Sequence, residues 1–323
     1  MTAILVVRPS SLGDVVHALS IVGDVVAARP GMAVDWVAEE AFVDLPPLSP
    51  HVRRTIPFAL RRWRHAPFAA ATWREVTAFR QALRGESYEA ILDLQEQIKG
   101  AIVSRAARGT RHGFDRASIR EPVATFFDDV HHAVPRNLHF AQRCRALAAA
   151  ALGYRLEGPP RWELVVRVPS EAAPARPFVV ALHATSRVGK LWPENRWRAL
   201  LEAMAGGGFA SVLPWGSEAE RSRSERLAAG IAQAVVPPRQ TLPALAALIS
   251  RAALVVGVDT GLTHLAAALG TPTVALFTET DPSRAGVAIA GTHARDLGGN
   301  GAVPTIEDAR AAAGALLRPA PRG

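Results

Sequence analysis

Residues 8–14 combine charge, hydroxyl groups and a carboxylate directly after a short apolar run, so they are candidates for acid–base chemistry. Asp14 could accept a proton from an attacking hydroxyl group. The hydroxyls of Ser10 and Ser11 could hold an anionic oxygen near the free N–H groups of a following helix. The spacing of Ser11 and Asp14 is also typical of a capping box, in which the carboxylate only completes the first helical turn. The spacing alone leaves both interpretations open.

A second polar segment, residues 183–193, follows the apolar run 178–182. It carries Thr185, Ser186 and Lys190, and Lys190 is one of only two lysines beside 35 arginines. A lysine is a compact charge that suits a phosphate group, so this segment is a candidate phosphate-binding loop. A solvated loop lysine is the alternative.

A third segment, residues 259–264, follows the apolar run 254–258 and predicts a helix that begins near Thr260. The free N–H groups and the positive dipole end of such a helix suit a diphosphate. His264 lies about one turn into that helix and could donate a further hydrogen bond. A helix cap beside a packed histidine explains the same pattern.

Two further groups of polar residues allow more than one interpretation. Glu218 and Glu220 follow the apolar run 209–213 and could bind sugar hydroxyls, or could favour a helix start as first-turn acids. A metal could be held by a pair of acids and a pair of histidines, although a solvated loop explains them too: Asp128, Asp129, His131 and His132. No Asp-x-Asp, HExxH, Cys/His ligand spacing or P-loop is present. We therefore expect Lys190 and helix dipoles, and no metal, to stabilise a leaving diphosphate.

The composition of the 323 residues, 49% hydrophobic and 20% charged, is that of a globular protein and excludes a largely disordered or fibrous chain. The single cysteine, Cys144, cannot form an internal disulfide. The apolar run 3–7 is too short for a signal-peptide core, and no run approaches the roughly 20 residues of a membrane span. We expect a cytoplasmic protein, soluble or peripheral to a membrane.

Basic residues are concentrated in one stretch. The chain has 37 basic and 29 acidic residues, but residues 51–84 hold eight arginines and a single acid, Glu75. Such a patch suggests an anionic partner such as phosphate, nucleic acid or lipid headgroups. Trp63, within the stretch, could lie at a membrane interface. A solvated surface is the alternative.

Apolar runs alternate with helical patterns in both halves of the chain, which is typical of parallel sheets with crossover helices. We expect strands at residues 4–8, 33–37, 90–94, 178–182, 209–213, 254–258 and 273–277, and a strand-like run at 162–168. We expect helices at residues 14–28, 73–83, 138–152, 194–205, 217–229, 242–250, 262–269 and 305–317.

These elements predict an α/β protein with two Rossmann-like, doubly wound domains. The expected boundaries are 1–160 for the first domain, 161–177 for a proline-rich linker, 178–304 for the second domain and 305–323 for a closing helix and tail. Ligands of such sheets bind at the carboxyl ends of the strands. We therefore expect a ligand cleft between the two domains.

Seven segments together resemble the ADP-heptose family of GT-B glycosyltransferases, in family order and over nearly the whole chain. They are residues 10–17 (SSLGDVVH), 35–40 (DWVAEE), 61–64 (RRWR), 120–122 (REP), 183–193, 214–216 (PWG) and 258–265. The resemblance implies a first domain that binds the acceptor and a second that binds ADP-heptose. Three positions depart from the family pattern: Arg8 stands where lysine is expected, Ser186 replaces threonine, and Leu191 replaces a polar residue.

The resemblance also implies roles for single residues. Asp14 matches the family's proposed catalytic base. The implied donor-binding residues are Thr185, Ser186, Lys190, Glu220 rather than Glu218, Asp259, Thr260, Gly261 and His264. The implied acceptor-binding residues are Ser10, Ser11, Arg61, Arg62, Arg64 and Arg120.

The activity that the resemblance implies is inverting transfer of L-glycero-D-manno-heptose from ADP-heptose to the first Kdo of Kdo2-lipid A. The expected protein needs no metal or other cofactor and works as a peripheral protein at the cytoplasmic face of the inner membrane. Two alternatives share the fold: a heptosyltransferase that acts later in core assembly, and a nucleotide-sugar epimerase. A basic nucleic-acid-binding protein is a third, although the chain has no recognised nucleic-acid motif.

Overall fold

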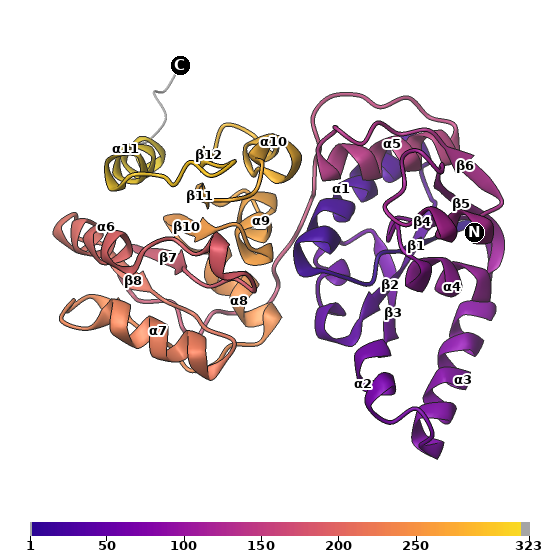
Figure 1. Ribbon diagram of the computed structural model, residues 1–323, viewed down its shortest axis with the longest axis horizontal. Coiled ribbons are helices and arrows are strands. Elements are labelled where there is room, and N and C mark those ends of the chain that lie inside the picture. Colours follow the sequence, from indigo (N-terminus) through magenta and orange to yellow (C-terminus); the bar gives the residue numbers. More distant parts are fainter. Residues whose placement is uncertain (1, 318–323) are drawn as a thin grey trace. The chain divides into compact units, whose positions relative to one another are not determined.

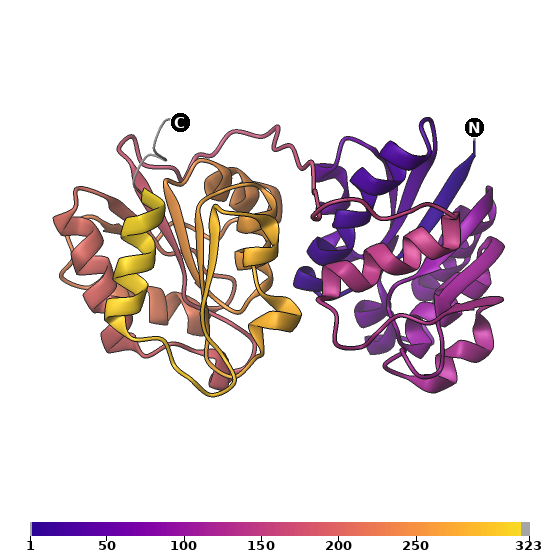
Figure 2. The same ribbon diagram turned by 90° about the horizontal axis from the view of Figure 1, so that it is seen from above.

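The computed structural model describes residues 2–317 and divides the chain into two compact units, Met1–Val165 and Val166–Gly323. Helices flank the sheet of each unit (Figures 1 and 2). The expected tail at residues 318–323 lies outside the described residues. Each unit is described by itself below.

The first unit is built on a six-stranded parallel sheet with the order β3-β2-β1-β4-β5-β6. The strands are β1 (Ala3–Val7), β2 (Ala33–Glu39), β3 (Val52–Phe58), β4 (Ser87–Asp93), β5 (Arg108–Phe114) and β6 (Val130–His132). The helices are α1 (Leu12–Ala28), α2 (Leu60–His65), α3 (Ala70–Arg84), α4 (Ile98–Ala106) and α5 (Phe140–Leu152). The central strand β1 is buried throughout, as its unbroken apolar run predicts.

The second unit is built on a six-stranded parallel sheet with the order β12-β11-β10-β7-β8-β9. The strands are β7 (Phe178–Leu182), β8 (Ala210–Val212), β9 (Ala234–Val235), β10 (Leu254–Val258), β11 (Thr273–Phe277) and β12 (Ala294–Gly298). The helices are α6 (Glu194–Gly206), α7 (Glu218–Ala228), α8 (Leu242–Ser250), α9 (Gly261–Ala268), α10 (Pro282–Ala285) and α11 (Ile306–Leu317). Helix α11 packs on α6 and on the sheet, so it is part of this unit's core.

Both sheets have the same connectivity, which confirms the predicted fold class. In each unit the first strand lies between the second and the fourth strand in chain order. The chain therefore reverses direction across the sheet between β1 and β4, and again between β7 and β10. Ligands of doubly wound sheets bind outside the carboxyl ends of the strands at such a switch point. The loops after these four strands are consequently the places to look for a site.

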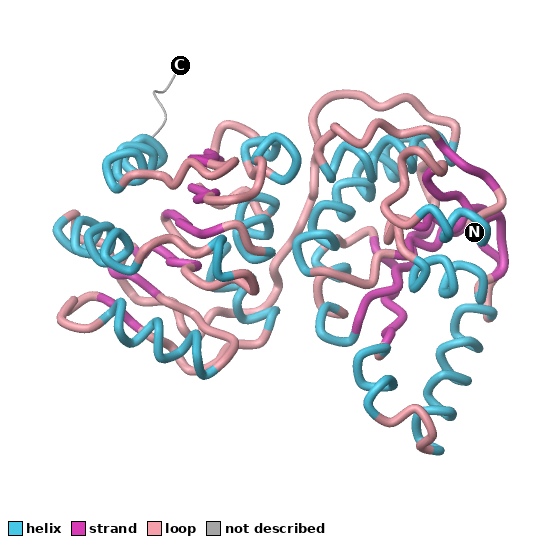
Figure 3. The backbone as a smooth tube through the Cα atoms, viewed as in Figure 1, coloured by secondary structure: helices cyan, strands magenta, loops and turns pink. Residues whose placement is uncertain are grey.

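The proline-rich segment contains no strand, so the prediction of a strand at residues 162–168 is wrong. Figure 3 draws this segment as loop. Its polar groups bond to the first unit instead of to a sheet: Trp162 Nε1 donates to the carbonyl oxygen of Val16 at 2.6 Å, and Val165 N donates to that of Leu48 at 2.7 Å. Trp162 is therefore buried against existing elements of the first unit, whereas Val165 and Val168 are exposed and pair with no strand.

Candidate functional site

The turn between β1 and α1 places Asp14 in the first turn of α1, where it has two kinds of partner. Its Oδ2 accepts hydrogen bonds from the backbone N and the Oγ of Ser11, both at 2.9 Å. Its Oδ1 lies 2.8 Å from the guanidinium of Arg8, which is buried at the end of β1. The bond from the Ser11 backbone is the one a capping box requires. Asp14 is thus both a helix cap and half of an ion pair.

The charge of Asp14 follows from these contacts. Burial favours the neutral acid, but the positive charge of Arg8 and the hydrogen bonds from Ser11 outweigh it and lower the pKa to about 2. The carboxylate is therefore ionised at neutral pH and can accept a proton. Its side chain is 32% exposed, so the group is open to a substrate hydroxyl.

The loop after β4 meets the turn after β1 at the switch point of the first sheet. Gln95 Oε1 accepts a hydrogen bond from the backbone N of Ser10 at 3.2 Å. Lys99 Nζ donates to Ser10 Oγ at 2.7 Å. Neither Gln95 nor Lys99 is among the site residues predicted from the sequence. Because Lys99 is one of the chain's two lysines, its rarity was the only signal that could have identified it.

The arginines expected to face the acceptor differ in how far their charge is already balanced. The guanidinium of Arg62 pairs with both Glu40, at 3.0 Å, and Glu75, at 2.8 Å. Within residues 2–317, Arg61, Arg64 and Arg120 are exposed and have no ion-pair partner. The predicted anion-binding role is therefore physically easiest for these three.

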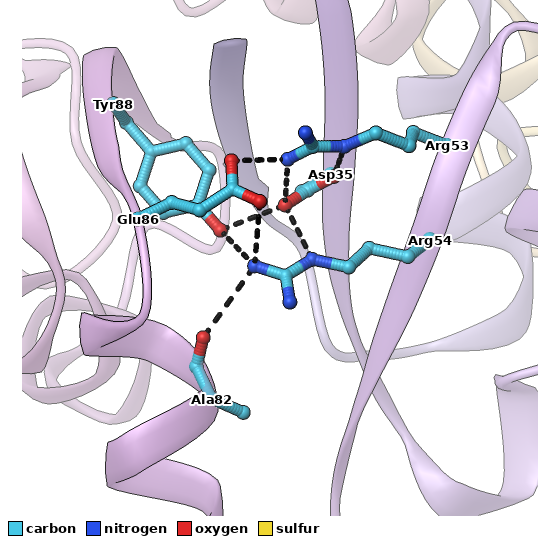
Figure 4. Close-up of polar contacts among 6 residues, drawn as sticks. All are labelled: Asp35, Arg53, Arg54, Ala82, Glu86 and Tyr88. Carbon is cyan, nitrogen blue, oxygen red and sulfur yellow. Dashed lines mark hydrogen bonds and ion pairs between the residues drawn. The ribbon is translucent and has the colours of Figure 1, made fainter.

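Two arginines of the basic stretch bind a carboxylate of the neighbouring strand and are not free for a ligand (Figure 4). The fully buried carboxylate of Asp35, on β2, accepts hydrogen bonds from Arg53 at 2.8 Å, from Arg54 at 2.6 Å and from the hydroxyl of Tyr88 at 2.8 Å. Burial alone would raise the pKa of Asp35, but these bonds lower it. Counting charges along the sequence therefore overstates how much of the patch is available to an anionic partner.

In the second unit, Asp259 joins the loops after β7 and β10. Its Oδ2 lies 2.6 Å from Lys190 Nζ, and its Oδ1 lies 3.3 Å from His264 Nε2. Thr185 Oγ1 donates to the carbonyl oxygen of Asp259 at 3.3 Å. Burial favours the neutral acid, but His264 and Lys190 outweigh this and hold the pKa of Asp259 well below its ordinary value. Four residues that the sequence analysis selected are thus in contact.

The start of α9 provides the backbone part of this site. Thr260 is the N-cap residue, with extended backbone, and Gly261 is the first helical residue. The helix is held to β10 because the buried Thr263 Oγ1 donates to the carbonyl oxygen of Val258 at 2.7 Å. Gly257 permits this contact, since a Cβ there would lie 2.1 Å from Thr263 Oγ1. Asp259 immediately precedes the N-cap of α9 and binds Lys190, so the positive end of the α9 dipole lies close to this lysine.

The loop after β11 contacts residue 189, in the loop that carries Lys190. Thr278 Oγ1 donates to the carbonyl oxygen of Gly189 at 2.6 Å. Glu279 packs so closely on Gly189 that a Cβ there would lie 1.7 Å from its Oε1. Residue 189 must therefore stay glycine unless Glu279 moves. Neither Thr278 nor Glu279 could be predicted from the sequence, because a single threonine and a single acid form no pattern.

Glu220 and Ser186 are the two predicted donor-binding residues that lie outside the cluster around Asp259. The carboxylate of Glu220 accepts hydrogen bonds from the backbone N of Gly216 at 2.7 Å and of Ser217 at 3.2 Å, so it caps α7. Glu218, in contrast, is 77% exposed and lies 3.7 Å from Arg221. Ser186 is exposed in the loop that carries Lys190. The roles of Glu220 and Ser186 in donor binding stay predictions.

Of the acids and histidines at residues 128–132, three bond to other residues, and Asp128 has no hydrogen-bond partner within residues 2–317. Asp129 pairs with Arg111, His131 Nε2 contacts the carbonyl oxygen of Thr125 at 2.8 Å, and His132 Nε2 contacts the ring of His112 at 3.0 Å. Across residues 2–317, no three His, Cys, Asp or Glu side chains are grouped as a metal site requires. In the same part of the chain, the helices are all too short or too polar to span a bilayer.

Comparison with known proteins places this geometry in a family. Residues 76–300 match the model of glycosyltransferase family 9 (heptosyltransferase). Lipopolysaccharide heptosyltransferase 1 of Escherichia coli K12 is 40% identical over 292 residues, which cover 88% of this chain and 90% of the relative. The structure of E. coli heptosyltransferase WaaC with ADP has a TM-score of 0.89 at 36% identity and covers 96% of this chain and 98% of that one. The structure of the same enzyme with ADP-2-deoxy-2-fluoro heptose has a TM-score of 0.85 at the same identity and coverage.

Proposed function

The chain belongs to glycosyltransferase family 9, the heptosyltransferases, and on that premise we propose that it adds the first heptose of the lipopolysaccharide core. The donor is ADP-heptose and the acceptor is the first Kdo of Kdo2-lipid A. The donor assignment is supported by the E. coli structures, which contain ADP and a fluorinated ADP-heptose. The acceptor assignment is supported by the similarity to heptosyltransferase 1 over 88% of the chain.

The cluster around Asp259 is the observation that carries the proposal. Asp259 holds Lys190 Nζ next to the N-terminus of α9. A cation and the positive end of a helix dipole therefore lie together where a diphosphate can bind. Both stabilise the negative charge that grows on a leaving diphosphate. Thr185 and Ser186 supply hydroxyls, Gly261 lets the phosphates approach the backbone, and His264 is held by Asp259. Glu220 is the proposed partner of the nucleotide ribose.

The first unit acts on the acceptor. Inversion at the anomeric carbon requires one displacement, in which the Kdo hydroxyl attacks from the face opposite to ADP. The ionised Asp14 takes the hydroxyl proton. Because its pKa of about 2 makes it a weak base, the proton moves late, as the new bond forms and the hydroxyl becomes acidic. Ser10, Ser11, Arg61, Arg62, Arg64 and Arg120 hold the acidic acceptor. The protein works peripherally at the cytoplasmic face of the inner membrane, without a metal.

Incubation with ADP-heptose and Kdo2-lipid A tests the proposal. Mass spectrometry should find one added heptose, in the presence or absence of EDTA. Transfer only to an acceptor that already carries heptose would instead identify a later enzyme of core assembly. Isomerisation of the donor without any acceptor would identify an epimerase. Consumption of ADP-heptose that stops with EDTA would contradict the expectation that no metal is needed.

A further inference from the structure

Helices α2 and α3 form a hairpin that projects beyond the sheet of the first unit (Figure 1). Its base is fixed in the core, because the rings of Phe58, Trp63 and Phe79 stack or meet edge to face at 5.2–5.7 Å. Trp63 Nε1 donates to Glu75 Oε2 at 2.8 Å, which ties α2 to α3. The hairpin is thus an ordered part of the fold.

Two aromatic residues at the tip of this hairpin lie outside that core. Phe68, in the loop between the helices, is 91% exposed, and Trp73, in the first turn of α3, is 61% exposed. The loop itself is ordered by a hydrogen bond from Thr72 Oγ1 to the carbonyl oxygen of Ala66 at 2.8 Å. Large apolar side chains that an ordered turn keeps exposed to solvent indicate an interaction surface. Aromatic rings are the residues that prefer the boundary between a bilayer and water.

An apolar groove begins beside Trp73 and runs between α3 and α4. Its volume is about 1320 Å³. Ile102 of α4, 56% exposed, lines it together with the buried Phe79 and Val103. The apolar surface of the tip therefore continues into a groove whose apolar lining suits a hydrocarbon chain.

The rim of this surface is positively charged. Arg64, Arg80, Arg84 and Arg105 line the groove, and Arg74 is exposed on α3. In the described part of the chain none of these five arginines has an ion-pair partner. The one acid on the groove, Glu121, already accepts hydrogen bonds from Ile98 N and Gln97 Nε2, both at 2.9 Å. An apolar centre with a basic rim is complementary to an anionic lipid, with its acyl chains and phosphate.

We propose that the α2–α3 hairpin is the membrane-docking surface of this protein, and that its partner is an anionic phospholipid bilayer. Phe68 and Trp73 lie at the level of the headgroups, the arginines contact lipid phosphates, and the groove receives an acyl chain. The inference rests on the proposed membrane location, but it requires no acceptor and no transfer reaction. Lys99 lines the groove and also donates to Ser10, so docking here brings the turn that carries Asp14 close to the bilayer.

Sedimentation with vesicles tests this surface separately from the enzyme reaction. The full chain should sediment with equimolar phosphatidylglycerol and phosphatidylcholine, but not with phosphatidylcholine alone. The double variant Phe68→Ser/Trp73→Ser should lower the partition coefficient at least tenfold. The double variant Arg74→Ala/Arg80→Ala should lower it about fivefold per arginine, and added salt should reduce that difference. Thermal unfolding should be unchanged in both, since all four side chains are exposed.

Matched variants outside the hairpin provide the controls. Phe126, which is 77% exposed on the same unit but does not line the groove, is changed by Phe126→Ser. Arg251 and Arg310, exposed on the second unit, are changed by Arg251→Ala/Arg310→Ala. Both should bind vesicles like the unmodified chain. Equal loss in Phe126→Ser, unchanged binding in Phe68→Ser/Trp73→Ser, or no binding of the unmodified chain would each overturn the docking surface. Failure of heptose transfer in a chain that binds vesicles would overturn the proposed function alone.

Discussion

Lys190 Nζ lies 2.6 Å from Asp259 Oδ2, so the cation proposed to bind a diphosphate is already paired with an anion. The pair fixes the position of the lysine at the start of α9 before the donor arrives. Its effect on affinity has two parts, because the lysine attracts the diphosphate and the aspartate repels it. The two parts can be separated by changing the residues singly and together.

Lys190→Ala should weaken the binding of ADP roughly 10–100-fold, the effect of losing a hydrogen bond to a charged group. It also leaves the carboxylate of Asp259 without its lysine partner. The double variant Lys190→Ala/Asp259→Asn should therefore bind ADP more tightly than Lys190→Ala, by removing that repulsion. Isothermal calorimetry measures both. Unchanged affinity in Lys190→Ala, or a double variant that binds more weakly still, would contradict this account.

Asp14→Asn should slow turnover ~10²–10⁴-fold because it removes the proton acceptor, and it should leave the affinity for ADP unchanged because the proposed donor site lies on the second unit. It should also lower the free energy of unfolding by more than the roughly 1 kcal/mol of a helix cap, since the change also leaves the buried Arg8 without its ion-pair partner. Asp308 is a matched control, because it occupies the same position in α11 and accepts a hydrogen bond from Thr305 Oγ1 at 2.7 Å. Asp308→Asn should lose about 1 kcal/mol, the contribution of the cap alone, and keep normal turnover. Normal turnover in Asp14→Asn would mean that another group is the base.

Arg64→Ala should raise the acceptor KM roughly 10–100-fold, the effect of losing one hydrogen bond to a charged group. Arg62→Ala should raise it less, because Glu40 and Glu75 already balance the charge of Arg62. The donor KM should not change in either variant. Steady-state kinetics with a water-soluble, deacylated acceptor measures both constants without interference from vesicle binding. The opposite ranking of the two variants would show that the ion pairs of Arg62 break when the acceptor binds.

Asp128→Asn should stabilise the protein at alkaline pH. Burial raises the pKa of Asp128 to about 6, and within residues 2–317 neither carboxylate oxygen has a hydrogen-bond partner. Because this pKa is above that of the unfolded chain, the folded state loses stability as the pH rises through about 6. At pH ~8 the variant should gain up to about 3 kcal/mol over the unmodified chain, and below pH ~4 the gain should vanish. Urea unfolding across this range checks the sign; a gain that is constant with pH would contradict the raised pKa.

The sequence predicted the buried elements well and the edge elements poorly. Four expected elements have the predicted bounds: β7, β10, β11 and α8. Each is a nearly continuous run of apolar residues, so the pattern of hydrophobic residues alone identifies them. In contrast, β5 reads Arg-Gly-Thr-Arg-His-Gly-Phe, and β6 has two histidines among its three residues, so neither forms an apolar run. Helix α4 was missed because exposed isoleucines at 98 and 102 blur its apolar face.

The site could be predicted where a motif follows a predicted strand. Asp259 comes directly after a buried strand, and Asp14 and Lys190 lie in the segments that follow two others, beyond the carboxyl ends of these strands. Gln95, Lys99 and Thr278 could not be selected, because each acts through one contact with a loop distant in the chain. Likewise, the pairing of Arg53 and Arg54 with Asp35 depends on the neighbouring strands β2 and β3, which no count of charges reveals.

The cluster around Asp35 has a consequence for the behaviour of the folded protein in solution. Arg53 and Arg54 lie on β3, which is the last strand of its sheet. The outer side of such a strand is a template on which a second chain can add a strand and begin to aggregate. That template is exposed more fully when an edge strand separates from its neighbour. The guanidinium groups of Arg53 and Arg54 reach inward to Asp35 on β2, so the ion pairs in Figure 4 hold the edge strand in its sheet and oppose such separation.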